Sequence, residues 1–226
     1  MQSTSLERVN NMEKTRMIFV RHGESEGNKV HAFLGHSDAN LSEKGHLQAE
    51  KTAEYLKNEK IDAFYSSDLK RAYQTGCHIA GRHGCAPIPD KELREVFAGE
   101  WDWKKFEDLL NEYPVSFGIW KDDVGNAHPD GGEKVSHLYD RIIKRVWEIA
   151  RENMGKTVLI TSHATPIRAL RAYWEGLGAE AMKNYPWAAN ASVSICDYFS
   201  DGHVEMITYS DDSFMGDLST HLPQNV

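Results

Sequence analysis

A short apolar run that ends at a charged triplet constrains this chain most. Residues 17–20 read Met-Ile-Phe-Val, which is typical of a buried strand, and Arg21, His22 and Gly23 follow directly. In open α/β sheets, functional groups collect where buried strands end at glycine-containing turns. The run therefore places an imidazole beside a guanidinium, the side chain best shaped to hold a phosphate with two hydrogen bonds. A histidine there is a candidate nucleophile or acid–base group.

A second buried strand is expected over residues 156–161, and it ends at Ser162 and His163. The carboxyl ends of parallel strands share one edge of a sheet, so His22 and His163 can meet although they lie far apart in the sequence. A single histidine at a strand end is more often structural. Two of them, one beside an arginine, favour a functional site.

The rest of the chain alternates between strand and helix patterns. Helices are expected from residue 43 to about 58, capped by Ser42, from about 68 to 81, from 133 to 153, and from 166 to about 176. Further strands are expected at 61–65 and 86–88, with a hairpin at 192–199 and 203–209 around Asp201-Gly202. In the first helix, Leu47, Ala49, Ala53 and Leu56 are expected to face inward. This order predicts an α/β three-layer sandwich with a mostly parallel central sheet and an antiparallel edge strand.

Residues 93–132 differ in character, because aromatic side chains there alternate with acidic ones. We predict an inserted helical lid with one or two short helices. Most of its rings, from Trp101 to Trp120, are expected in the core, with one or two facing a substrate. The domain prediction is a flexible N-terminal tail over residues 1–15 and a single domain over 16–226.

Composition limits the partners. The chain has 226 residues and a net charge of −8, which disfavours nucleic acid. No apolar run is long enough for a membrane helix, and no apolar leader is visible. Three scattered cysteines, Cys77, Cys85 and Cys196, suggest reduced thiols and a cytoplasmic location. The histidines show no metal-ligand spacing, so no metal or other cofactor is expected.

A second arginine occurs in the segment Ser66-Ser67-Asp68-Leu69-Lys70-Arg71. Arg71 is expected in the first turn of a helix that follows a strand, where free N–H groups and the helix dipole favour anions. The alternative is an exposed arginine on a solvated helix face.

Six ordered motifs resemble the histidine phosphatase superfamily, also called phosphoglycerate mutase-like. Their order over residues 17–209 makes the resemblance specific, whereas the first triplet alone would be weak. They are Arg21-His22-Gly23-Glu24 with Asn28; Leu41-Ser42-Glu43-Lys44-Gly45 with Gln48-Ala49; Ser66-Ser67-Asp68-Leu69 with Arg71-Ala72 and Thr75; Leu93-Arg94-Glu95 with Gly99 and Trp101; Pro129 to Glu133; and Ser162-His163 with Ile167-Arg168.

The resemblance implies a mechanism. His22 would attack a phosphoryl group and become a phosphohistidine, and the positive charge of Arg21 and Arg71 would lower its pKa and keep it neutral. The arginines would stabilise the transferring group, so no metal is needed. Glu95 would protonate the leaving oxygen and then activate water.

Other residues complete the predicted site. The resemblance implies that His163 and Asn28 help to cradle the phosphoryl oxygens. Ser25 could touch the phosphate or merely order its loop, with neither alternative preferred. Ala164 and Thr165 follow His163 where the family commonly has glycines, and their backbone N–H groups remain available.

The acid motif favours a phosphatase. Residues 95–99 lack the extra basic side chains that a phosphoglycerate mutase carries there. We predict a metal-independent phosphomonoesterase acting on a small phosphorylated metabolite, with a mutase-type phosphotransferase and a phosphate-binding protein without turnover as alternatives. Trp103 replaces a usual glycine and is expected to narrow or gate the pocket. The edge strands leave open whether the chain forms a homodimer or faces water.

Overall fold

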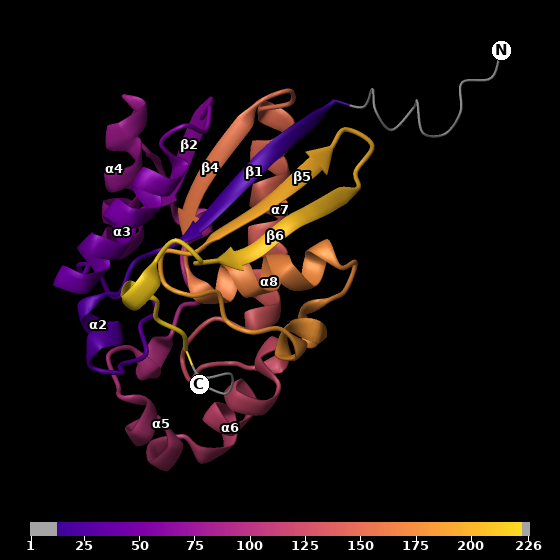
Figure 1. Cartoon of the computed structure of the whole chain (residues 1–226). Helices are drawn as coiled ribbons and strands as arrows, with labels where there is room; N and C mark the ends of the chain where they lie inside the picture. Colours follow the sequence, from indigo (N-terminus) through magenta and orange to yellow (C-terminus); the bar gives the residue numbers. More distant parts are fainter. Residues whose placement is uncertain (1–12, 223–226) are drawn as a thin grey trace.

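Six strands form one sheet in the part of the chain that the computed structural model describes, residues 13–222 (Figure 1). The order is β3-β2-β4-β1-β5-β6. The strands are β1 (Lys14–Arg21), β2 (Ala63–Ser67), β3 (Ile88–Asp90), β4 (Thr157–Ser162), β5 (Val193–Phe199) and β6 (Val204–Asp211). The first four pair in parallel, while β5 is antiparallel to both β1 and β6. The predicted parallel sheet with an antiparallel edge is therefore confirmed.

Helices cover both faces of the sheet. They are α2 (Glu26–Lys29), α3 (Glu43–Leu56), α4 (Lys70–His83), α5 (Phe106–Glu112), α6 (Pro114–Asp122), α7 (Val135–Glu152) and α8 (Ala164–Trp174). Successive residues of a strand point to opposite faces. Met17 and Phe19 of β1 accordingly pack in the core with α7 and α8, and Ile18 and Val20 pack in the core with α3 and α4. The three-layer arrangement follows from this alternation.

Helix α3 begins where its capping residue predicts. The Ser42 side chain accepts a hydrogen bond from the backbone N–H of Gly45, which satisfies a free donor of the first turn. The expectation for Leu47 is wrong, because its side chain is 56% exposed. Buried polar residues, Gln48 and Thr52, occupy the inward stripe instead, and each hydrogen-bonds the chain beyond the helix.

Several boundaries differ from prediction. Strand β1 begins at Lys14, so Lys14 and Thr15 do not belong to the predicted tail. Thr15 is buried, and its hydroxyl donates to the carbonyl oxygens of Ala150 and Asn153 at 2.7 and 2.9 Å. Residues 1–12 of the predicted tail lie outside the described residues. Helix α8 begins at Ala164, two residues ahead of the proline expected to open it.

The segment predicted as a lid contains α5 and α6, on the side toward which the arrows of β1 and β4 point (Figure 1). Trp101 is fully buried and contacts Phe33, Phe117 and Trp120 edge to face. The prediction of core rings in this segment is confirmed for Trp101, Phe117 and Trp120, which are all buried. No helix within residues 13–222 is long and apolar enough to cross a membrane.

Candidate active site

The ends of β1 and β4 bring the two predicted histidines together. The strands are neighbours, with Arg21 in register with Ser162, and the backbone N–H of His22 donates to the Ser162 carbonyl at 3.0 Å. The ring centroids of His22 and His163 are 5.1 Å apart, in an edge-to-face arrangement. Both side chains are buried. The shared edge of a parallel sheet thus gives the meeting that the sequence predicts.

One hydrogen bond fixes the orientation of His22. Its Nδ1 lies 2.7 Å from the carbonyl oxygen of Gly23, and a carbonyl can only accept. Nδ1 must therefore carry the proton, which leaves the lone pair on Nε2. Burial, and then the charges of Arg71 and Arg21, hold the pKa of His22 well below its usual value. The imidazole is neutral at neutral pH, as a nucleophile must be.

Close backbone packing holds the turn that carries His22. A side-chain carbon on Gly45 would lie 1.9 Å from the carbonyl oxygen of Glu24, and one on Gly23 would lie 2.5 Å from the Gly45 carbonyl oxygen. The start of α3 therefore rests directly on the turn after β1. Only glycine fits at these two positions.

Arg21 and Arg71 are buried beside the histidines. Arg21 Nη1 donates to the Ala188 carbonyl at 2.5 Å, and Arg71 donates to the carbonyls of Gly35 and Ser37 at 2.8 and 2.9 Å. Burial lowers the pKa of each guanidinium to about 10, so both stay charged at neutral pH. Within the described residues, the Nε of each is buried without a hydrogen-bond partner. The alternative of an exposed Arg71 is wrong, because it is 1% exposed.

Asp102 supports the loop that holds Arg71. Its two carboxylate oxygens accept hydrogen bonds from the backbone N–H groups of Gly35 and Ser37, each at 2.9 Å. The carbonyls of the same two residues bind Arg71. The sequence carries no local signal for this role, because the contact joins two distant loops.

Trp103 does not line the pocket, contrary to expectation. Its backbone has φ of +66°, and its side chain is 48% exposed. The positive φ belongs to a tight turn in which its N–H donates to the Phe33 carbonyl at 2.9 Å.

His163 lies behind His22 and does not line the cavity itself. Its Nε2 is 2.8 Å from the hydroxyl oxygen of Ser67, at the end of β2, and its Nδ1 is buried without a partner in the described residues. Burial, followed by the charge of Arg71, lowers the pKa of His163 well below its usual value. Ser67 belongs to the arginine motif, but its partnership with His163 joins two strand ends and has no local signal.

Glu95 faces the cavity and is 7% exposed. Its carboxylate accepts hydrogen bonds from the backbone N–H groups of Val96 and Thr165, at 2.8 and 3.2 Å. The contact with Thr165 joins the acid motif to the second-histidine motif. Ala164 and Thr165 line the cavity beside it.

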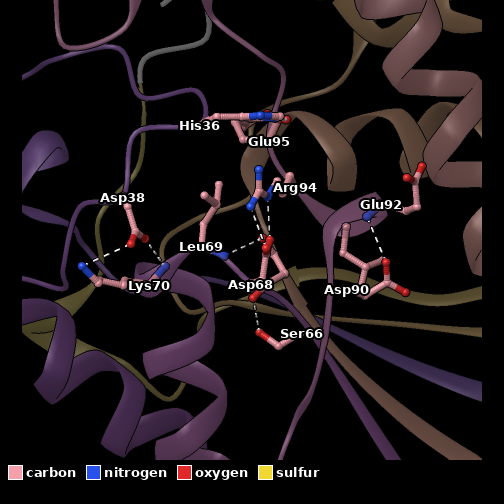
Figure 2. A network of polar contacts seen from close by, with 12 residues as sticks. His36, Asp38, Ser66, Asp68, Leu69, Lys70, Asp90, Glu92, Arg94 and Glu95 are labelled. Carbon is pink, nitrogen blue, oxygen red and sulfur yellow. Dashed lines mark hydrogen bonds and ion pairs between the residues drawn. The ribbon is translucent and has the colours of Figure 1, made fainter.

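A polar network anchors the loop of Glu95 to the start of α4 (Figure 2). Arg94 donates to both carboxylate oxygens of Asp68, each at 2.6 Å, and His36 Nε2 lies 2.9 Å from the Glu95 carbonyl oxygen. Asp38 accepts from the backbone N–H of Lys70 at 2.7 Å. The loops that carry the acid and cradle Arg71 are therefore fixed to one helix end.

Asn28 lines the cavity, and Ser25 orients the Asn28 side chain. The Asn28 side-chain oxygen accepts from the N–H and hydroxyl of Ser25 at 3.1 and 3.0 Å, which leaves the amide donors for a ligand. Ser25 is buried, caps α2 and does not line the cavity. Of its two predicted roles, the structure therefore supports ordering of the loop.

The cavity is open to solvent, and its empty space, with the open part included, is about 490 Å³. Charged and polar site residues form one portion of its lining, and aromatic side chains form another. The aromatic residues are Phe33, Phe106, Trp120 and Trp187. Phe106 and Trp120 belong to the predicted lid, whereas Trp187 was not predicted. Across residues 13–222, no three His, Cys, Asp or Glu side chains are grouped to hold a metal ion.

The chain belongs to the histidine phosphatase superfamily (branch 1), whose family model matches residues 17–211. It is 34% identical over 181 residues to phosphoserine phosphatase 1 of Hydrogenobacter thermophilus, covering 80% of this chain and 85% of that protein. It is 32% identical over 162 residues to phosphoglycerate mutase-like protein 4 of Arabidopsis thaliana, covering 70% of each.

Solved structures show the same fold. YhfR of Bacillus stearothermophilus has a TM-score of 0.84 at 25% identity, over 89% of this chain and 99% of that one. A mycobacterial glucosyl-3-phosphoglycerate phosphatase has a TM-score of 0.81 at 25% identity, over 88% of this chain and 100% of that one. The family and the names of these relatives identify the chain as a phosphomonoester hydrolase.

Proposed function

We propose that this chain hydrolyses a small phosphorylated metabolite through a phosphohistidine formed on His22, without a metal. One observation carries the proposal. The bond from Nδ1 to the Gly23 carbonyl leaves the lone pair of a neutral His22 on Nε2, beside two charged, buried guanidinium groups. A neutral nucleophile next to paired cations suits attack on a phosphoryl dianion.

In the first step, His22 Nε2 attacks phosphorus, a P–N bond forms and the ester P–O bond breaks. Arg21, Arg71 and Asn28 hold the phosphoryl oxygens and stabilise the charge that spreads over them. His163 acts through its contact with the His22 ring, and the Ser67 hydroxyl donates to its Nε2 and holds it in place. Glu95 gives its proton to the leaving oxygen.

In the second step, water attacks the phosphohistidine. The Glu95 carboxylate takes a proton from the water as the new P–O bond forms and the P–N bond breaks. Phosphate leaves, His22 is regenerated and Glu95 is protonated again, so the cycle balances. The hydrogen bonds from Val96 and Thr165 keep the carboxyl group in place for both steps.

A mutase would return the phosphoryl group to a second hydroxyl of an anionic substrate. Among the described residues, Arg21 and Arg71 are the only lysine or arginine side chains that line the cavity. Both are assigned to the phosphoryl group. This arrangement favours transfer to water.

The test is release of inorganic phosphate from a panel of phosphorylated metabolites and an aryl phosphate, with chelator present. Wild type is compared with His22→Ala and with His137→Ala, which removes an exposed histidine. We expect chelator-resistant turnover that only His22→Ala abolishes. An alkaline quench, which preserves phosphohistidine, should show one added phosphoryl mass in wild type. Turnover at near wild-type rate in His22→Ala would refute the mechanism, and isomerisation of 3-phosphoglycerate without hydrolysis would identify a mutase.

A further inference from the structure

The aromatic side chains of the cavity form one continuous surface. Trp120 and Trp187 stack with their ring centroids 5.8 Å apart and an angle of 17° between their planes. Phe33 meets Trp120 edge to face at 4.8 Å and Phe106 at 6.0 Å. The rings come from four separate segments, the loop after α2, helices α5 and α6, and the loop before β5. We call these four residues the aromatic wall.

Arg168 holds one end of the aromatic wall in place. Its guanidinium lies 4.0 Å from the centroid of the Trp187 ring, and its Nε donates to the Met182 carbonyl at 2.8 Å. Trp187 therefore has Arg168 and Trp120 as stacking partners. Burial lowers the pKa of Arg168 to about 10, so it keeps the charge that attracts it to the ring. The wall is formed before any substrate binds.

The cavity offers no cation for a second anionic group. Its charged lining residues, within the described chain, are Arg21, Arg71 and Glu95. The two arginines are already assigned to the phosphoryl group. A carboxylate or second phosphate beside the aromatic wall would lose its hydration without gaining a cationic partner, which is costly. An uncharged ring would instead gain from burial and stacking.

We propose that the substrates are phosphomonoesters with an uncharged, ring-bearing leaving group, selected by Trp120 and Trp187. This inference rests on the proposed hydrolase function and names its substrate class. The proposal separates this chain from relatives named for phosphoserine and glucosyl-3-phosphoglycerate, which carry additional charged groups.

The test compares 2-phenylethyl phosphate with O-phosphoserine. Both are esters of primary alcohols, so the comparison reports mainly on the leaving group's binding. For wild type, we expect kcat/KM to favour the phenylethyl ester by at least about tenfold, equivalent to about 1.4 kcal/mol. Trp187→Leu and Trp120→Leu should each reduce this preference severalfold. Trp103→Leu is the matched control, since it removes an exposed tryptophan outside the cavity and should leave the preference unchanged.

For each variant, the ratio of kcat/KM for 2-phenylethyl phosphate to kcat/KM for O-phosphoserine does not depend on the concentration of folded enzyme. If Trp187→Leu does not fold, Trp187→Phe replaces it. The smaller ring reduces the stacked area and should still lower the ratio. Equal or greater activity on O-phosphoserine in wild type would overturn the inference while leaving the hydrolase function intact. An unchanged ratio in the wall variants would also overturn it. Absence of His22-dependent phosphate release from every ester would instead refute the proposed function.

Discussion

The two buried histidines predict that the folded chain loses stability as the pH falls below 7. Burial and neighbouring positive charge lower the pKa of both His22 and His163. In the unfolded chain, a histidine binds its proton near pH 6.5. Below that pH the unfolded state therefore binds more protons than the folded state, so the free energy of unfolding decreases as the pH is lowered. The stabilisation is present above pH 6.5 and is lost below it.

The magnitude follows from the linkage relation. A histidine that stays neutral in the folded chain, while the unfolded chain titrates near pH 6.5, contributes roughly 2 kcal/mol between pH 7 and pH 5. For two histidines that both stay neutral down to pH 5, the sum is at most roughly 4 kcal/mol. This is a large part of the roughly 5–15 kcal/mol that stabilises a typical domain.

The assay is guanidinium-induced unfolding at pH 7, 6 and 5 in phosphate-free buffer, because phosphate bound to the folded chain would mask the effect. Between pH 7 and pH 5, the free energy of unfolding should fall less in the double variant His22→Asn/His163→Asn than in wild type, by up to roughly 4 kcal/mol. His137→Asn, at an exposed position, should keep the full wild-type dependence. Equal losses in wild type and the double variant would show that these histidines are not held neutral by the fold.

Further predictions concern the acid, the second arginine and a buried hydroxyl. Glu95→Gln should lower kcat for alkyl esters by roughly 10²–10⁴-fold. It should lower kcat less for aryl esters, because their leaving group needs less protonation, and equal losses in steady-state assays would contradict the role of Glu95 as the acid. Arg71→Lys should weaken inhibition by orthophosphate at least about tenfold, because the ammonium cannot reproduce the planar fork; an unchanged inhibition constant would place Arg71 outside the phosphate cradle. Thr15→Val should lower the free energy of unfolding by about 1–3 kcal/mol without changing kcat, whereas Thr15→Ser keeps the hydroxyl and should lose less; equal losses in denaturant unfolding would indicate packing as the cause.

The sequence predicts the parts of the site that depend on strand ends. Arg21 and His22 come immediately after the apolar run at 17–20, and His163 comes at the end of the strand that begins with the apolar run at 158–160. Parallel pairing carries such strand ends to one edge of the sheet. Helix α7 is equally predictable, because Val135, Leu138 and further apolar residues recur at helical spacing.

The missed features depend on contacts between distant segments or on buried polar groups. Trp187 reaches the cavity from a loop with no periodic pattern, and Asp102 acts on a loop far away in sequence. On α3, Gln48 and Thr52 are buried because each finds a hydrogen-bond partner beyond the helix. Apolar spacing does not detect buried polar residues, and it therefore predicts the wrong face for Leu47.

Strand β4 has a consequence for how activity arises during synthesis and refolding. It lies between β1 and β2, and it carries His163 to His22. A chain that ends before Thr157 already contains His22, Arg71 and Glu95 but lacks the strand that joins their supports. Pairing of β4 with β1 closes a long loop, which is slow compared with forming local helices. During refolding, enzymatic activity should therefore recover at the same rate as β4 inserts into the sheet, and later than the helical circular dichroism signal. Recovery of activity can thus be used to follow this insertion.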